Sequence, residues 1–435
     1  MKFIKLILLS LFPFLLFGQV EQSGLSSKMV EPSIKDTLDL QKLIDKALPG
    51  DTIKLKAAIY KGGVTVRMSS IVIDGQNHAI VDGNGRGSVI KIRANSVYIK
   101  NMIIQNSGGL HDHVDAGISL ADSAQNNIIE NCRIRECLFG IDVMQSFHNK
   151  IIHCEISSFM KRETALKGDA IRFWYSKNNI VQYNYWHNAR DMVVWYSSEN
   201  LFQFNKSVGN RYAIHFMYSH NNRIQNSYFT GNSVGVFLMY SQKTIMTGNT
   251  VANCKGPSGM CLGMKETSSN QILNNKFIYS AEGIHFDVSP YVLTETNTIQ
   301  DNEIAFCNIG MKFHNKQEGN LIRYNYFHNN LLQVFSEVGT ANLNTWEYNY
   351  WDDYEGFDRD GDNIGDNPYV LLSYTEHIWN FDENLRFFYG APILSVLDFL
   401  EKLAPFSKPK LVLRDTKPIY NWREEMKKRK ESNDE

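Results

Sequence analysis

Methionine, tryptophan and histidine side chains recur at one position of a series of short alternating segments in the middle of the chain. The segments read GIDVMQS, AIRFWYS, MVVWYS, AIHFMYS, GVFLMYS, GMCLGMKE, GIHFDVS and GMKFHNK, between Gly140 and Lys316. Alternation along a strand turns one set of side chains inward and the other outward. The inward set is uniformly apolar. The outward set forms a ladder of Met144, Trp174, Trp195, Met217, Met239 and Met264, followed by Asp287 and His314.

This outward ladder has the chemistry of a soft-metal site. Thioethers are ligands that suit Cu(I), imidazole suits either copper state, and an indole face can cover a cation. His215 and Met217 are two residues apart, and Met239 and Met264 follow on the next segments. Residue types alone leave two other interpretations open: an apolar surface for docking a protein partner, which they favour, and a face covered by a loop.

A second candidate site lies near the C-terminal end of the chain, in the sequence DRDGDNIGD. Asp358, Asp360, Asp362 and Asp366 place carboxylates at alternate positions around a glycine turn. Hard oxygen ligands converging in this way suit calcium, with a structural role. Asn363 stands where the EF-hand pattern expects glycine, so a solvated turn is the alternative.

Asparagine punctuates the chain in two columns that must mark the corners of the structure carrying these segments. One column comprises Cys132, Cys154, Asn184, Asn205, Asn226, Asn249, Asn275, Asn302 and Asn325, and the other lies five residues earlier in each repeat and includes Asn200 and Asn221. Asparagine tolerates a left-handed corner, and its amide can bond to the amide of the next coil. The pattern predicts an all-β, right-handed parallel β-helix, a solenoid in which stacking supplies the core.

The rest of the chain divides around this solenoid. We expect a signal peptide over residues 1–18, where Lys2 and Lys5 precede an apolar run, and hence export to the periplasm. An N-terminal cap segment follows over 19–59, with helical spacing in 34–48, and the β-helix occupies 60–350. An Asp-rich loop segment (351–383), a C-terminal helix and tail (384–422) and a charged disordered tail (423–435) complete the chain. Its six cysteines are predicted to be repeat-filling thiols in preference to disulfide bridges.

Composition narrows the class of partner. Charged residues make up 21% of the chain and the net charge is -1, so electrostatic capture of nucleic acid is not expected. Secreted β-helices include polysaccharide lyases and carbohydrate-binding proteins, which is the alternative function. The outward ladder favours a non-enzymatic role, because its acids are confined to Asp142 and Asp287.

Several motifs together resemble the NosD family of periplasmic nitrous oxide reductase maturation proteins. They are RDMVVWYS, RYAIHFMYSHNN, NSVGVFLMYS, NYWDDYEGFDRDGDNIGDNPY and LAPFSKPKLVLRDTKP, in order over about residues 36–418. The resemblance implies a non-catalytic assembly factor that assists copper delivery to the copper-sulfur cluster of the reductase, and it leaves sulfur delivery open as a second role. It implies as partners the apo-reductase, an ABC transporter with permease and ATPase subunits, and a copper chaperone lipoprotein.

The residue chemistry and the resemblance meet at the outward ladder. We expect His215, Met217, Met239 and Met264 to hold copper transiently. Trp174, Trp195 and His285 are expected to frame the surface that docks the client protein.

Overall fold

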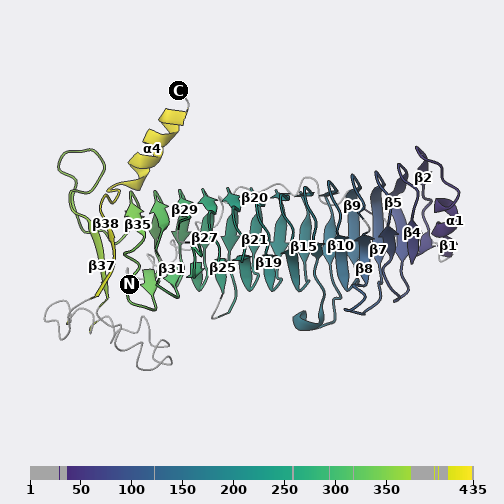
Figure 1. The fold of residues 1–435 in the computed structure, drawn as a ribbon, viewed down its shortest axis with the longest axis horizontal. Helices are drawn as coiled ribbons and strands as arrows, with labels where there is room; N and C mark the ends of the chain where they lie inside the picture. Colours follow the sequence, from purple (N-terminus) through teal and green to yellow (C-terminus); the bar gives the residue numbers. More distant parts are fainter. Residues whose placement is uncertain are drawn as a thin grey trace, which may run out of the picture.

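The protein is an all-β parallel β-helix, described here in a computed structural model. The structure describes residues 29, 37–121, 123–256, 259–292, 294–316, 318–373, 396, 400 and 410–433. Figure 1 shows the coils stacked along the long axis, with the short helix α1 (Leu40–Ile44) at one end and an antiparallel pair of strands at the other. None of the helices in the described ranges is long and apolar enough to cross a membrane.

One side of the solenoid is a twelve-stranded parallel sheet that carries the candidate ladder. Its strands are β4 (Val64–Val66), β6 (Ile90–Ile92), β8 (Ala116–Leu120), β10 (Phe139–Met144), β13 (Ile171–Trp174), β16 (Asp191–Trp195), β19 (Tyr212–Met217), β22 (Val234–Met239), β25 (Met260–Lys265), β28 (Glu282–Asp287), β31 (Ile309–Phe313) and β34 (Leu332–Ser336).

The remaining sides belong to a 24-stranded sheet that splits into two runs of short strands. One run contains β2 (Thr52–Lys54), β5 (Val72–Asp82), β7 (Tyr98–Gln105), β9 (Ile128–Arg135), β11 (Lys150–Ile152), β14 (Ile180–Gln182), β17 (Leu201–Gln203), β20 (Arg223–Gln225), β23 (Ile245–Thr247), β26 (Gln271–Leu273), β29 (Asn297–Gln300), β32 (Asn320–Arg323) and β35 (Thr345–Glu347). The other contains β1 (Thr37–Asp39), β3 (Ile59–Lys61), β12 (Glu155–Ser157), β15 (Tyr185–His187), β18 (Lys206–Val208), β21 (Tyr228–Thr230), β24 (Thr250–Ala252), β27 (Lys276–Ile278), β30 (Glu303–Ala305), β33 (Tyr326–His328) and β36 (Tyr350–Trp351). The long strands β5 and β9 each pair with strands of both runs, and β7 lies between them.

Inward side chains of consecutive coils build one continuous core. Beneath the twelve-stranded sheet, Phe173, Phe216 and Phe286 are fully buried, and Phe286 stacks on Phe313 with ring centroids 4.6 Å apart. Since each coil contributes only a narrow strip of apolar side chains, burial depends on the coils above and below. The core therefore fixes the register of the outer face.

Buried asparagines tie the coils together, as the sequence pattern predicted. The Asn184 backbone N–H donates to the Asn205 side-chain oxygen at 3.0 Å, and the Asn184 amide also donates to the Ile151 carbonyl at 2.9 Å. The predicted register was wrong by one residue in one coil, where the ladder runs through Asn222 and Ser227 and not through Asn221 and Asn226. Asn221 and Asn226 instead occupy left-handed corners, with φ of 56° and 48°.

The two ends differ from the expected organisation. At the N-terminus, β1 pairs with β3 and β2 pairs with β5, so coil stacking already begins within the predicted cap segment 19–59. A 3-10 helix, η1 (Thr164–Leu166), lies in a loop between coils. Antiparallel β37 (Tyr369–Ser373) and β38 (Lys410–Asp415) lie at the C-terminal end (Figure 1).

The prediction of a disordered tail over 423–435 was wrong, because residues Trp422–Asn433 form the helix α4. Trp422 stacks on Tyr326 with centroids 4.9 Å apart, and Arg429 pairs with Asp301. These contacts with the solenoid hold a charged sequence in helical form. The predicted signal peptide 1–18 lies outside the described residues, as does the predicted C-terminal helix and tail 384–422 apart from Val396, Leu400 and residues 410–422.

Candidate functional site

The outer face of the twelve-stranded sheet carries the predicted ladder over its central coils. Strand pairing aligns one column as Met144, Trp174, Trp195, Met217, Met239, Lys265 and Asp287. The neighbouring column reads Asp142, Arg172, Val193, His215, Phe237, Gly263, His285 and Lys312. Adjacent strands lie about 4.8 Å apart, so neighbours within a column are within side-chain reach.

Met264 does not belong to this ladder, and the prediction that placed it there was wrong. It pairs with Leu238 and is completely buried in the core, whereas Lys265 takes the outward place beside Met239. A one-residue change in register turns every side chain of a strand to the other face. Gly263 shows why this register is kept, because a Cβ there would lie 2.3 Å from the ring of Phe237.

His215, Met217 and Met239, which we call the soft-donor patch, remain together on the outer face. His215 and Met217 are neighbours on the same side of β19, and Met217 pairs with Met239 on β22. All three side chains are half-buried. An imidazole and two thioethers at adjoining positions form a donor set that suits Cu(I).

Aromatic rings surround the imidazole of His215. Tyr212 stacks on it with centroids 5.0 Å apart, while Trp195 and Phe237 approach edge-on at 6.2 Å and 5.8 Å. The burial that results lowers the pKa of His215 to about 4. The ring is therefore neutral at neutral pH, with a lone pair available for a ligand. Its Nδ1 atom is buried and has no hydrogen-bond partner.

The carboxylate nearest to His215 in this network is already engaged. Asp191 forms a two-point ion pair with Arg211, whose Nε lies 2.9 Å from Oδ1, and it also accepts a hydrogen bond from the Tyr212 backbone N–H at 3.1 Å. Its side chain is only 1% exposed. Because a paired carboxylate is a poor free ligand, the surroundings of the patch favour soft ions over hard ones.

Trp174 and Trp195 adjoin the patch and continue into a row of tyrosines. The two indoles meet at 5.9 Å, and Tyr175, Tyr196, Tyr218 and Tyr240 stack with centroids 4.8 to 5.3 Å apart. These tyrosines have left-handed φ values of 49° to 50°. The sequence pattern contained this row as the repeated Tyr-Ser pair, but the tyrosines were not predicted as part of the face.

His285 lies apart from the soft-donor patch, in a cluster of charges. Its Nδ1 atom is 2.7 Å from Glu282, which also binds Lys312 at 3.0 Å, and Lys265 pairs with Asp287 at 2.6 Å. Beyond the patch the outer face thus changes from apolar to ionic.

Met260, which was not predicted, adds a half-buried thioether near Gly263.

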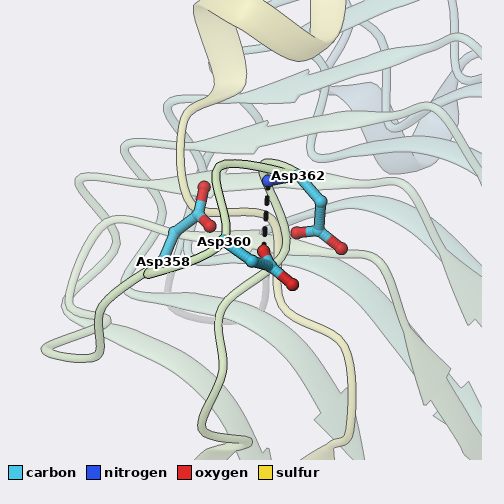
Figure 2. A group of neighbouring side chains, drawn as sticks. All are labelled: Asp358, Asp360 and Asp362. Carbon is cyan, nitrogen blue, oxygen red and sulfur yellow. Dashed lines mark hydrogen bonds between the residues drawn. The ribbon is translucent and has the colours of Figure 1, made fainter.

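The Asp-rich loop brings three of its four predicted residues together. The carboxylates of Asp358, Asp360 and Asp362 lie within 4.8 Å of one another. Figure 2 shows them along one loop, where the Asp362 amide donates to Asp360 at 3.2 Å. Asp366 does not belong to this group, and it accepts from the Arg359 amide at 2.8 Å. This geometry fits a cation on the first three residues.

The six cysteines show no bridge. All of them are buried free thiols, in agreement with the prediction of repeat-filling residues. Cys132 and Cys154 occupy ladder positions where other coils carry asparagine, and the Cys154 N–H donates to Asn184.

Comparison with solved structures finds other β-helices at low sequence identity. The A-module of mannuronan C-5 epimerase AlgE6 from Azotobacter vinelandii is 13% identical, with a TM-score of 0.47 over 68% of this chain and 90% of that one. A family 28 exopolygalacturonase from Yersinia enterocolitica is 11% identical, with a TM-score of 0.48 over 70% of this chain and 75% of that one.

Comparison with curated proteins finds relatives of similar length. A "Probable ABC transporter binding protein NosD" from Stutzerimonas stutzeri is 24% identical over 402 residues, which cover 84% of this chain and 86% of the relative. A protein of the same name from Pseudomonas aeruginosa is 24% identical over 376 residues, covering 78% and 82%. Residues 158–356 match the family model described as "Periplasmic copper-binding protein (NosD)", and this segment contains the whole soft-donor patch.

Proposed function

We propose that this chain is a NosD-type periplasmic accessory protein that assists copper delivery during maturation of nitrous oxide reductase, with sulfur delivery as a second candidate role. The matched family model supports periplasmic copper handling. The names of the two bacterial relatives support work alongside an ABC transporter. The proposed partners are the apo-reductase, the transporter's permease and ATPase subunits, and a copper chaperone lipoprotein.

The soft-donor patch is the observation that carries this proposal. A protein that passes copper to another needs ligands that hold the ion without trapping it, and it needs them at a surface. His215, Met217 and Met239 meet both needs, because they are half-buried on the outer face and their imidazole is neutral at neutral pH. Copper is the cargo in this proposal and leaves with the client.

Trp174 and Trp195 border the patch, and we assign them to the surface that holds the client. Exposed aromatic and methionine side chains favour adaptable protein contacts. His285 belongs to the ionic margin beyond Phe237, where Lys265, which pairs with Asp287 at 2.6 Å, would contact a partner through charge. The two zones together would give a client both an apolar centre and a polar rim.

We also infer that the protein acts without catalysis. The outer-face acids that a polysaccharide lyase or glycosidase would need are held in ion pairs, with Asp142 bound to Arg172 at 2.7 Å and Asp287 to Lys265 at 2.6 Å. Of these alternatives, a polysaccharide lyase would form unsaturated products from uronic-acid polymers. We expect no rise in ultraviolet absorbance when purified protein is incubated with a panel of such polymers.

The proposal is tested by removing sulfur from the patch. Met217→Leu and Met239→Leu together keep size and apolarity, so the fold should persist while the thioethers are lost. The double variant is expressed in cells whose nitrous oxide reductase maturation depends on this gene. We expect the reductase purified from these cells to be depleted of copper.

Met264→Leu is the matched control. It makes the same chemical change at an inward position and should leave copper loading of the reductase intact. Full copper loading in cells that carry the double variant would contradict the assignment of the cargo to this patch.

A further inference from the structure

Two buried polar atoms that lack hydrogen-bond partners belong to rings in contact on the outer face. In the described ranges such atoms are Nε1 of Trp195, Nδ1 of His215 and Oγ1 of Thr244. The rings of Trp195 and His215 are in perpendicular contact, with centroids 6.2 Å apart. Folded proteins rarely leave buried polar groups unpaired, so an unpaired indole N–H and an unpaired imidazole nitrogen on two rings in contact require an explanation.

Packing alone holds these two rings in place. Tyr212 stacks on His215, and Trp174 contacts Trp195 at 5.9 Å. No hydrogen bond orients the indole of Trp195. Its orientation therefore depends on the contacts of its π surface and its edge. In the register of the sheet, Trp195 pairs directly with Met217, which pairs in turn with Met239.

We propose that Trp195 is the fourth member of the metal site, and that its indole covers a Cu(I) ion held by His215, Met217 and Met239. This inference rests on the proposed function and deepens it, because it assigns the cargo's oxidation state and adds a residue otherwise placed in client docking. One imidazole and two thioethers leave one side of a monovalent ion open. The electron-rich face of an indole attracts a cation and excludes water from that side.

The surroundings of the patch favour the monovalent state of copper. Asp191 is occupied by Arg211 and by the Tyr212 amide, so the site offers Cu(II) no free carboxylate. Soft thioethers and a covering aromatic ring suit Cu(I), whereas Cu(II) prefers harder nitrogen and oxygen ligands in a square arrangement. The site therefore binds Cu(I) more tightly than Cu(II).

The test measures Cu(I) affinity of the full-length purified protein without oxygen, by competition with a chromophoric Cu(I) chelator. Trp195→Leu removes the aromatic face and should weaken Cu(I) binding by about 3- to 30-fold, the range of a cation–π contact. Trp195→Phe retains an aromatic ring of smaller quadrupole and should give an intermediate loss. Trp422→Leu, which removes an indole from α4 on another side of the molecule, should leave the affinity unchanged.

A fluorescence measurement on the same proteins reports contact with the ion directly. Cu(I) added to the wild-type protein should quench part of the tryptophan emission, and this part should be absent in Trp195→Phe but present in Trp422→Leu. Unchanged Cu(I) affinity and unchanged quenching in both Trp195 variants would overturn the covering role of Trp195. That result is distinct from failure of the proposed function, in which the wild-type protein itself binds no Cu(I).

Discussion

The pKa of His215 leads to a prediction about stability that does not depend on copper. Burial among Tyr212, Trp195 and Phe237 lowers this pKa from 6.5 to about 4, so the folded state favours the neutral ring. The unfolded chain binds a proton on this residue at an ordinary pKa near 6.5. As the pH falls below 6.5, protonation stabilises the unfolded state while the folded state resists it. Stability from this residue is therefore complete above pH 6.5 and falls until the pH reaches about 4.

The size of the effect follows from the two pKa values. The difference between a pKa of 6.5 in the unfolded chain and about 4 in the folded protein corresponds to about 3 kcal/mol, of which about 2 kcal/mol is lost between pH 7.5 and pH 5. His215→Phe removes the titrating group and keeps a ring that fits the aromatic surroundings. The variant should lose about 2 kcal/mol less than the wild-type protein over that interval. Other titrating groups contribute equally to both proteins, so they cancel in the difference.

Urea unfolding at pH 7.5, 6.5, 5.5 and 5.0 measures this difference, and proton NMR of the histidine ring reports the pKa itself. If the unfolding free energies of wild-type and His215→Phe proteins fall in parallel as the pH is lowered, the ring is not held neutral by its surroundings. A ring resonance of His215 that titrates near pH 6.5 in the folded protein would refute the reasoning independently.

Three further changes test the framework of the site. Asn302→Ala removes a buried amide that donates to the Ile272 carbonyl at 2.8 Å. In urea titrations the substitution should lower the free energy of unfolding by about 3 kcal/mol. A loss below about 0.5 kcal/mol would contradict the role of the asparagine ladder. Gly263→Ala places a Cβ 2.3 Å from the ring of Phe237, so we expect a destabilisation of about 1–3 kcal/mol. A melting temperature equal to that of the wild type would contradict this packing. We also propose that Asp358, Asp360 and Asp362 bind calcium. Ca²⁺ at about 100 times its dissociation constant should stabilise the loop by about 2.7 kcal/mol, as measured by thermal unfolding. An equal effect of Ca²⁺ on the Asp360→Asn variant would count against binding at these residues.

Much of the fold could be predicted because the sequence repeat contains the same structural pattern many times. Alternating apolar residues and buried amides recur in coil after coil, so a local error in one coil does not change the architecture. The outward position of His215, Met217 and Met239 followed from the same alternation. These residues lie in coils that match their neighbours without insertions.

The errors arose where local pattern admits two registers. Asn221 and Asn222 are adjacent, and only stacking on Asn200 shows which amide enters the ladder. Met264 follows a loop of different length, so aligning Met264 with Met239 put the strand one residue out of register. The structure instead pairs Met260 with Val234, and this choice depends on the space that Gly263 leaves for Phe237. The helix α4 was missed for a similar reason, since its contacts with Tyr326 and Asp301 come from distant coils.

The corner that follows the ladder explains why the soft-donor patch stays in place without a metal. Tyr218 and Tyr240 follow Met217 and Met239 in left-handed conformations that cost a non-glycine residue about 1–2 kcal/mol each. Buried serines come next, and the Ser219 N–H donates to the Ser241 hydroxyl at 3.1 Å while the Ser219 hydroxyl donates to the Val194 carbonyl at 2.8 Å. These bonds, with the stacked tyrosines, oppose any slip of one coil against the next. The two thioethers are therefore held at the spacing of the backbone. In the proposed transfer, a partner would take the ion from them without unfolding the strand that carries them.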